Sequence, residues 1–245
     1  ERFLTQGLEL RRGTYGPDHL EVADSLFALG DFLRSSREKN PAAERMLRDA
    51  LEIQTRKLGA RHPDVARTLA GLGRALYSQG RFQEAEESMR RALAMQRELL
   101  GATDQEVGQT LAALAIVFHA QGQLEDAAPL YLEALAVLER HVGRDHPLYV
   151  STLGSLASVY RARKEYDRAE PLLRQVLAAE RKTYGDRHLK VALVANNLGL
   201  MLADQAKFEE AERLVREALA IRTELRGAGE SSLAMTVVNL GYVLH

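Results

Sequence analysis

Apolar residues recur at helical spacing along the chain, most clearly between residues 59 and 100. The first apolar stripe consists of Val65, Leu69, Leu72, Gly73 and Leu76. These positions fall at i, i+4, i+7, i+8 and i+11, which is one face of an α-helix. After a Gln-Gly-Arg break, a second amphipathic helix is marked by Phe82, Ala85, Met89, Ala92, Leu93 and Leu99. The pattern therefore predicts a hairpin of two helices that is too thin to bury its own apolar stripes.

This hairpin pattern repeats through the chain with a nearly constant period. Each copy starts at a connector glycine, and these glycines are Gly16, Gly59, Gly101, Gly143, Gly185 and Gly227. The first interval is 43 residues, and each of the next four is 42 residues. A leucine stands thirteen residues after every one of these glycines, and a glycine or alanine follows it. Because stacked copies share a core that a single copy lacks, we predict an all-α solenoid of helix-turn-helix repeats.

The period also predicts where the repeats begin and end. We expect one array over residues 1–245, with complete hairpins at 17–58, 60–100, 102–142, 144–184 and 186–226. A shift of 43 residues aligns residues 1–15 with the second helix of a hairpin, and residues 228–245 match a first helix. Natural arrays close with a polar-faced capping helix, and neither end has one. We therefore expect this chain to be a piece of a longer protein.

Composition narrows the classes of partner. Lys plus Arg number 33 and Asp plus Glu 34, so the formal net charge is −1 and no chain-wide field attracts nucleic acid or an anionic membrane. The absence of cysteine excludes disulfides, thiolate zinc sites and cysteine nucleophiles. No apolar run approaches the roughly 18 residues that span a bilayer, and no signal peptide is visible. We expect a cytoplasmic protein that binds neither nucleic acid nor membranes.

The candidate chemical motifs favour structural roles. Four of the seven histidines recur in successive connectors, at His19, His62, His146 and His188. Each belongs to a different turn, so we predict structural roles for them and no metal site. The glycine-rich segment 227–232 imitates a phosphate loop, but no strand precedes it and it occupies a connector position. No nucleophile elbow, His-Glu-x-x-His motif or isolated pair of acids is present. We predict that the protein has no cofactor and is not an enzyme.

The spaced residues Leu72-Gly73, Leu76, Ala85, Met89 and Ala92 resemble the tetratricopeptide repeat family. The family's standard unit is about 34 residues. The longer period here, with connectors such as those at 59–63 and 143–147, is similar to the variant in kinesin light chains and many bacterial relatives. The resemblance implies a right-handed superhelix in which the first helix of each repeat lines a concave groove. It also implies that this groove binds a peptide segment of a partner protein.

The resemblance also implies which residues contact such a peptide. Transfer of the groove positions gives Arg34, Arg74, Tyr77, Gln109, His119, Ser155, Ser158, Arg161, Asn196, Asn197 and Asn239. In kinesin light chains, the carboxamides of a Leu-Asn-Asn-Leu segment hold the backbone of an extended peptide. Segments 194–198 and 238–240 keep this pattern, whereas Gly71, Ala113 and Ser155 replace the second asparagine in the middle repeats. Since a carboxamide both donates and accepts hydrogen bonds, Asn197 and Asn239 are our main candidates for backbone recognition.

Several alternatives stay open at this point. The groove arginines either take an acidic side chain of a ligand or belong to a solvated face whose ion pairs are worth about 0–1 kcal/mol. His119 is either a partner contact or a surface histidine. Besides an interaction module, the chain could be a regulatory arm of a larger effector, such as a kinase, a caspase-like protease or an NTPase. A third alternative is self-association through exposed apolar ends, at Leu4 and Leu8 and at Leu240 and Leu244.

Overall fold

A computed structural model of the protein describes residues 1–34, 36, 40–225 and 230–244. Within these residues the chain forms twelve helices and no strand, which confirms the predicted all-α fold class. The helices are α1 (Arg2–Tyr15), α2 (Leu20–Leu33), α3 (Asn40–Leu58), α4 (Pro63–Ser78), α5 (Phe82–Leu100), α6 (Gln105–Ala120), α7 (Leu124–His141), α8 (Pro147–Ala162), α9 (Tyr166–Tyr184), α10 (Leu189–Asp204), α11 (Phe208–Glu224) and α12 (Glu230–Leu244). Residues 226–229, which include the first half of the glycine-rich segment at 227–232, lie outside the described residues, so the assignment of this segment stays a prediction.

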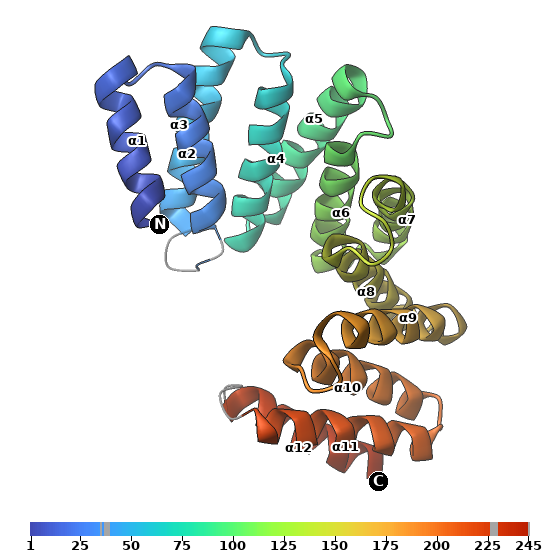
Figure 1. Ribbon diagram of the computed structural model, residues 1–245. Coiled ribbons are helices and arrows are strands. Elements are labelled where there is room, and N and C mark those ends of the chain that lie inside the picture. Colours follow the sequence, from blue (N-terminus) through green and yellow to red (C-terminus); the bar gives the residue numbers. More distant parts are fainter. Residues whose placement is uncertain (35, 37–39, 226–229, 245) are drawn as a thin grey trace. The chain divides into compact units, whose positions relative to one another are not determined.

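The helices pack as consecutive pairs, as the repeat pattern predicts (Figure 1). The two helices of α2/α3, α4/α5, α6/α7, α8/α9 and α10/α11 lie against each other. The second helix of a pair also contacts the first helix of the next pair at α3 and α4, at α5 and α6, and at α9 and α10. At these three junctions a helix thus buries its apolar stripe against its partner and against the next pair, which is how thin hairpins acquire a common core.

The helices group into two compact units. The first, Glu1–His141, holds α1–α7, and we call it the N-terminal unit. The second, Val142–His245, holds α8–α12, and we call it the C-terminal unit. The helix bounds fall inside the five predicted hairpins, while the prediction of a single array over residues 1–245 stays a prediction.

The first helices of the pairs begin with a shared cap. The side-chain Nδ1 atoms of His19, His62, His146 and His188 accept a hydrogen bond from the backbone N–H two residues later, at 3.1–3.2 Å. Asp104 caps α6 in the same way, at 2.8 Å. Such a cap satisfies one of the N–H groups that a helix leaves unpaired at its start. The structural role predicted for the four connector histidines is confirmed.

Small residues set the spacing of the helix pairs. Gly30, Gly73 and Gly199 each follow a buried column leucine. A Cβ atom at these glycines would lie only 2.6–2.9 Å from a side chain of the second helix and 3.0–3.1 Å from one of its carbonyl oxygens. In the pairs α6/α7 and α8/α9 the same column holds Ala115 and Ala157, which are fully buried. The column therefore admits nothing larger than a methyl group.

The first and last helices, α1 and α12, have more exposed apolar side chains than the equivalent helices of the complete pairs. Leu8 of α1, which we expected at an exposed end, is buried because it packs with Val22 and other core residues of α2. The most exposed apolar residues of α1 are instead Phe3 and Leu10, at 86% and 71%. On α12, Leu240 is half-buried and Leu244 is exposed. Each of these two helices therefore presents an apolar face to solvent.

Candidate functional site

The predicted site residues lie in both units. Five belong to the N-terminal unit: Arg34, which directly follows α2, Arg74 and Tyr77 on α4, and Gln109 and His119 on α6. Six belong to the C-terminal unit: Ser155, Ser158 and Arg161 on α8, Asn196 and Asn197 on α10, and Asn239 on α12. All except Arg34 lie within the first helix of a pair or, for α12, the helix equivalent to one.

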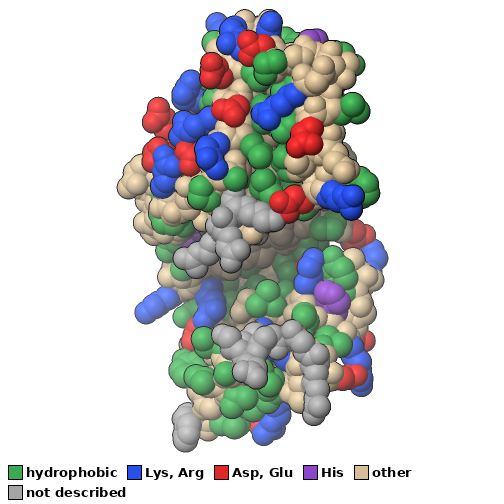
Figure 2. Space-filling view, turned by 90° about the vertical axis from the view of Figure 1, so that its left-hand side faces the viewer, with side chains coloured by type: hydrophobic (Ala, Val, Ile, Leu, Met, Phe, Trp, Pro, Cys, Tyr) green, Lys and Arg blue, Asp and Glu red, His purple; other side chains and the backbone are tan. Residues whose placement is uncertain are grey.

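In the N-terminal unit, two predicted arginines converge on an acid of their own chain. Arg34 Nε lies 2.7 Å from Asp31 Oδ1, and Arg74 Nη2 lies 3.3 Å from the same oxygen. Burial would raise the pKa of Asp31, but hydrogen bonds and charge from the two arginines outweigh it and lower that pKa. Basic and acidic side chains also intermingle over the visible face of this unit (Figure 2). Both arginines are therefore already engaged with an acid of their own chain.

The other predicted residues of the N-terminal unit are not gathered at one point. The ring of Tyr77 packs against Phe82, with centroids 5.7 Å apart. Gln109 and His119 are half-buried on α6, three helical turns apart. Partial burial lowers the pKa of His119, which favours the neutral imidazole. Tyr77 also lines a hollow of about 590 Å³ at the turn between α4 and α5, together with Asn40, Ser78 and Gln79, but none of the other predicted site residues lines it.

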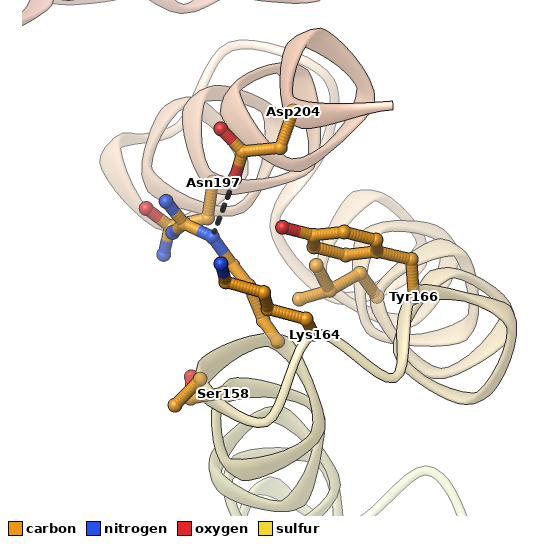
Figure 3. A pocket seen from close by; sticks show the side chains of 8 residues that line it. Ser158, Lys164, Tyr166, Asn197 and Asp204 are labelled. Carbon is orange, nitrogen blue, oxygen red and sulfur yellow. Dashed lines mark ion pairs between the residues drawn. The ribbon is translucent and has the colours of Figure 1, made fainter. Parts of the chain in front are cut away.

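The C-terminal unit has a polar hollow of about 330 Å³. It lies where the end of α8 and the start of α9 meet α10 (Figure 3). Its walls are formed by Ser158, Arg161, Ala162, Lys164, Tyr166, Leu173, Asn197 and Asp204. Three of these, Ser158, Arg161 and Asn197, are predicted site residues. The structure thus brings a subset of the predicted residues to one place.

The acid of this hollow is held by two neighbours. Arg161 Nε lies 3.6 Å from Asp204 Oδ2. The hydroxyl of Tyr242, on α12, donates to Asp204 Oδ1 at 3.1 Å, and this bond raises the pKa of Tyr242. Asp204 therefore has partners on both of its oxygens, one from α8 and one from α12.

Three other polar groups of the hollow have no partner of their own among the described residues. They are the ammonium of Lys164, the hydroxyl of Tyr166 and the carboxamide of Asn197, and Figure 3 shows all three side chains directed into the same space. The hydroxyl of Ser158, by contrast, donates to the backbone oxygen of Gly154 at 3.0 Å. The hollow thus offers several hydrogen-bond donors and one carboxamide acceptor to a ligand.

The two adjacent asparagines have different surroundings. Asn197 lines the hollow, whereas Asn196 is only 5% exposed. The carboxamide oxygen of Asn196 accepts a hydrogen bond of 3.0 Å from Asn239 Nδ2, which joins α10 to α12. This differs from the expectation that both asparagines are open to a ligand. Neighbours on a helix are rotated by about 100°, so one side chain faces the hollow and the other faces α12.

Three polar residues of the hollow, Lys164, Tyr166 and Asp204, are not among the predicted site residues. Tyr166 occupies the column of Phe82 and Leu124, so it read as an apolar packing residue. Lys164 lies in the turn between α8 and α9, where the equivalent turns have Gly80 and Gly122. The signal that could have revealed it is a lysine at a position where two other repeats have glycine.

The described residues also bear on metal binding and on membrane insertion. They contain no group of three or more His, Cys, Asp or Glu side chains that could hold a metal ion. None of the described helices is long and apolar enough to cross a bilayer. The polar hollow of the C-terminal unit is therefore the candidate that we pursue.

Consecutive helix pairs, buried leucine columns and capped connectors define a helical repeat protein. The chain belongs to the tetratricopeptide repeat family, whose model matches residues 32–98, 76–140, 106–182 and 148–224. This confirms the resemblance drawn from the spaced leucine, glycine and alanine positions. Repeats of this family generally serve as protein-interaction modules.

Solved structures show the same fold. The crystal structure of BtubC (BKLC) from P. vanneervenii is 24% identical, with 85% of this chain and 83% of that chain covered and a TM-score of 0.70. The crystal structure of a Podosopora anserina putative kinesin light chain with nearly identical TPR-like repeats is also 24% identical, with 85% and 99% covered and a TM-score of 0.71. No curated protein sequence is significantly similar to the chain. The predicted likeness to kinesin-light-chain repeats is thus confirmed for the fold.

Proposed function

We propose that this protein is a protein-interaction module whose C-terminal unit binds a peptide segment of a partner at the polar hollow between α8 and α10. The observation that carries the proposal is the convergence of Lys164, Tyr166 and Asn197, whose polar groups lack partners among the described residues. Family membership supports the general role. The hollow supplies a specific place for it.

The chemistry of the hollow suits an extended peptide. A peptide backbone that leaves water needs partners for both its N–H and C=O groups, because an unpaired buried polar group costs about 1–3 kcal/mol. The carboxamide of Asn197 provides both kinds of partner in one side chain. Ala162 and Leu173 add apolar wall, against which an adjacent side chain of the peptide can pack.

The test is a selection from a random-sequence peptide library displayed on phage, followed by affinity measurements with the selected peptides. We expect Asn197→Ala to weaken binding about three- to tenfold, the equivalent of one lost hydrogen bond. Gln175 is the matched control, because it is an exposed carboxamide on α9 of the same unit and does not line the hollow. Failure to select any peptide, or equal affinities for the Asn197→Ala and Gln175→Ala proteins, would contradict the proposal, with circular dichroism verifying the fold of each.

A second candidate function, self-association, is favoured by the exposed face of α12. Val237 and Leu244 are 53% and 52% exposed, whereas the equivalent residues of complete pairs, such as Leu153 and Leu202, are buried. Gly241 belongs to the same column as Gly199, yet a Cβ atom there would meet nothing within 4 Å. The face that normally receives the second helix of a pair is therefore open on α12.

We propose that α1 of a second copy is the occupant of this face. By the repeat register, α1 is a second helix, and Leu4 is equivalent to Leu47. Leu47 Cγ lies 2.9 Å from where a Cβ atom of Gly30 would be, so a leucine fills this slot in a complete pair. The exposed Phe3 and Leu10 of α1 are equivalent to Met46 and Ile53, which pack in the core of their pair.

Such head-to-tail contacts make open chains of molecules, because the two surfaces in each contact are different. Sedimentation velocity over a dilution series should show mass increasing with concentration. A Val237→Asp/Leu244→Asp protein loses the surface on α12, and a Phe3→Asp/Leu10→Asp protein loses the surface on α1. Each protein should therefore stay monomeric on its own. An equimolar mixture of the two should form one-to-one dimers. A monomeric wild type, or a mixture that fails to dimerise, would contradict self-association.

A further inference from the structure

The turn between α8 and α9 holds a lysine in a backbone conformation that favours glycine. Lys164 has φ 59°, while Gly80 and Gly122 at the equivalent turns have φ 77°. Left-handed backbone is unfavourable for residues with a Cβ atom, which crowds the neighbouring carbonyl. Ala206, at the same turn of the next pair, also has φ 59° and carries no functional group. These two turns therefore share a backbone strain, but only one of them presents a charge.

The side chain of Lys164 extends into the polar hollow (Figure 3). The charged groups that line this hollow are Lys164, Arg161 and Asp204. Asp204 is paired with Arg161 and with the hydroxyl of Tyr242. Lys164 forms no ion pair with any described residue. Two cations and one anion leave the hollow with one surplus positive charge.

The donors around this charge suit a carboxylate. The Lys164 ammonium, the Tyr166 hydroxyl and the Asn197 carboxamide can all donate to one anion, and charge-assisted hydrogen bonds of this kind are the stronger ones. A phosphate monoester carries about −1.5 to −2 charge at pH 7, and it would have to lie beside the carboxylate of Asp204. A singly charged carboxylate matches the one surplus positive charge better.

We propose that Lys164 is a specificity-determining residue that selects partner peptides with an Asp or Glu side chain placed in this hollow. The inference rests on the proposed peptide-binding function and adds the chemistry of the residue that the site accepts. It also assigns a use to a lysine at a turn position where two other repeats have glycine.

The experiment compares three variants against peptides selected from the random library, each peptide made with its acidic residue as Glu, as Gln and as phosphoserine. Lys164→Gly should weaken binding of the Glu peptide about fivefold, which corresponds to one exposed charge pair. It should also raise the melting temperature, because it relieves the left-handed backbone. Ala206→Gly should raise the melting temperature with no change in affinity. Lys164→Gln, which keeps the backbone strain, should lose affinity without gaining stability.

A double-mutant cycle, with Lys164→Gly in the protein and Glu→Gln in the peptide, isolates the contact between Lys164 and the acidic side chain. Wild type should prefer the Glu peptide to the Gln peptide about fivefold, and Lys164→Gly should bind the two equally. Selected peptides without acidic residues, an unchanged Glu preference in Lys164→Gly, or tighter binding of the phosphoserine peptide would each overturn the inference. If Asn197→Ala loses affinity while Lys164→Gly does not, the peptide site stands and only the role of Lys164 fails.

Discussion

The carboxamide of Asn239 on α12 donates a 3.0 Å hydrogen bond to the carboxamide oxygen of Asn196 on α10. Asn196 is buried, so its side-chain oxygen has Asn239 as its described hydrogen-bond donor. This donor lies on α12, which is equivalent to the first helix of the next pair. The bond joins two helices that belong to successive repeats. A residue pair that could be assigned to ligand binding from sequence thus has a clear part in holding the C-terminal unit together.

Asn239→Ala should therefore destabilise the protein although Asn239 is itself only half-buried. The substitution leaves the Asn196 oxygen without its donor, which costs about 1–3 kcal/mol. Urea unfolding followed by circular dichroism measures the change. Asn197→Ala is the matched control, because its carboxamide has no described partner, and we expect a change below about 0.5 kcal/mol. Equal stabilities of the two variants would contradict the structural role of the Asn196–Asn239 bond.

The fold could be read from the sequence because the repeat determines the packing. The leucine that follows each connector glycine by thirteen residues is buried in all five complete pairs. The small residue that follows this leucine is Gly30, Gly73 or Gly199 in three of the pairs. At each of these glycines the second helix of the pair leaves no room for a Cβ atom. These contacts join two consecutive helices of one repeat, so the same residue types recur at the same place in every repeat and can be recognised in the sequence.

The site was less predictable because it depends on contacts that the period does not encode. The transfer of the family's groove positions predicts Ser158, Arg161 and Asn197, and all three line the hollow. Lys164 was missed because the direction of its side chain follows from a left-handed turn. Asn196 is a predicted site residue because it matches an asparagine of the family's Leu-Asn-Asn-Leu segment, and only the packing of α12 on α10 separates its role from that of Asn197.

The cap of α8 can be tested at His146. Its Nδ1 atom accepts a 3.1 Å hydrogen bond from the backbone N–H of Leu148. His146→Ala removes this acceptor and should lower the free energy of unfolding by about 1 kcal/mol. His146→Asp should restore the stability, because Asp104 caps α6 in the same geometry. Urea unfolding of the three proteins checks the order, and an alanine variant as stable as wild type would argue against the cap.

His119 gives the protein a dependence on acid pH. Partial burial lowers the pKa of His119 below its ordinary value of 6.5, because the imidazolium loses water on α6. The unfolded chain therefore binds the proton more readily. The contribution of His119 to stability is fully present above pH 6.5 and is lost as the pH falls through the lower pKa of the folded state. Proton NMR titration of the His119 ring should give a midpoint below 6.5, and His119→Gln should remove this part of the pH dependence of unfolding.

Two glycines of one column should respond to alanine in opposite directions. A Cβ atom at Gly73 would lie 2.6 Å from Met89 Cγ and 3.1 Å from the carbonyl oxygen of Ala85. Gly73→Ala must push α4 and α5 apart or displace Met89, which costs about 1–3 kcal/mol. At Gly241 nothing lies within 4 Å of the added atom, so Gly241→Ala should gain about 0.5–1 kcal/mol from helix propensity. Urea unfolding at a concentration where the chain is monomeric measures both. A stable Gly73→Ala protein would mean that the paired helices are free to separate, and the close approach inferred for this column would then be wrong.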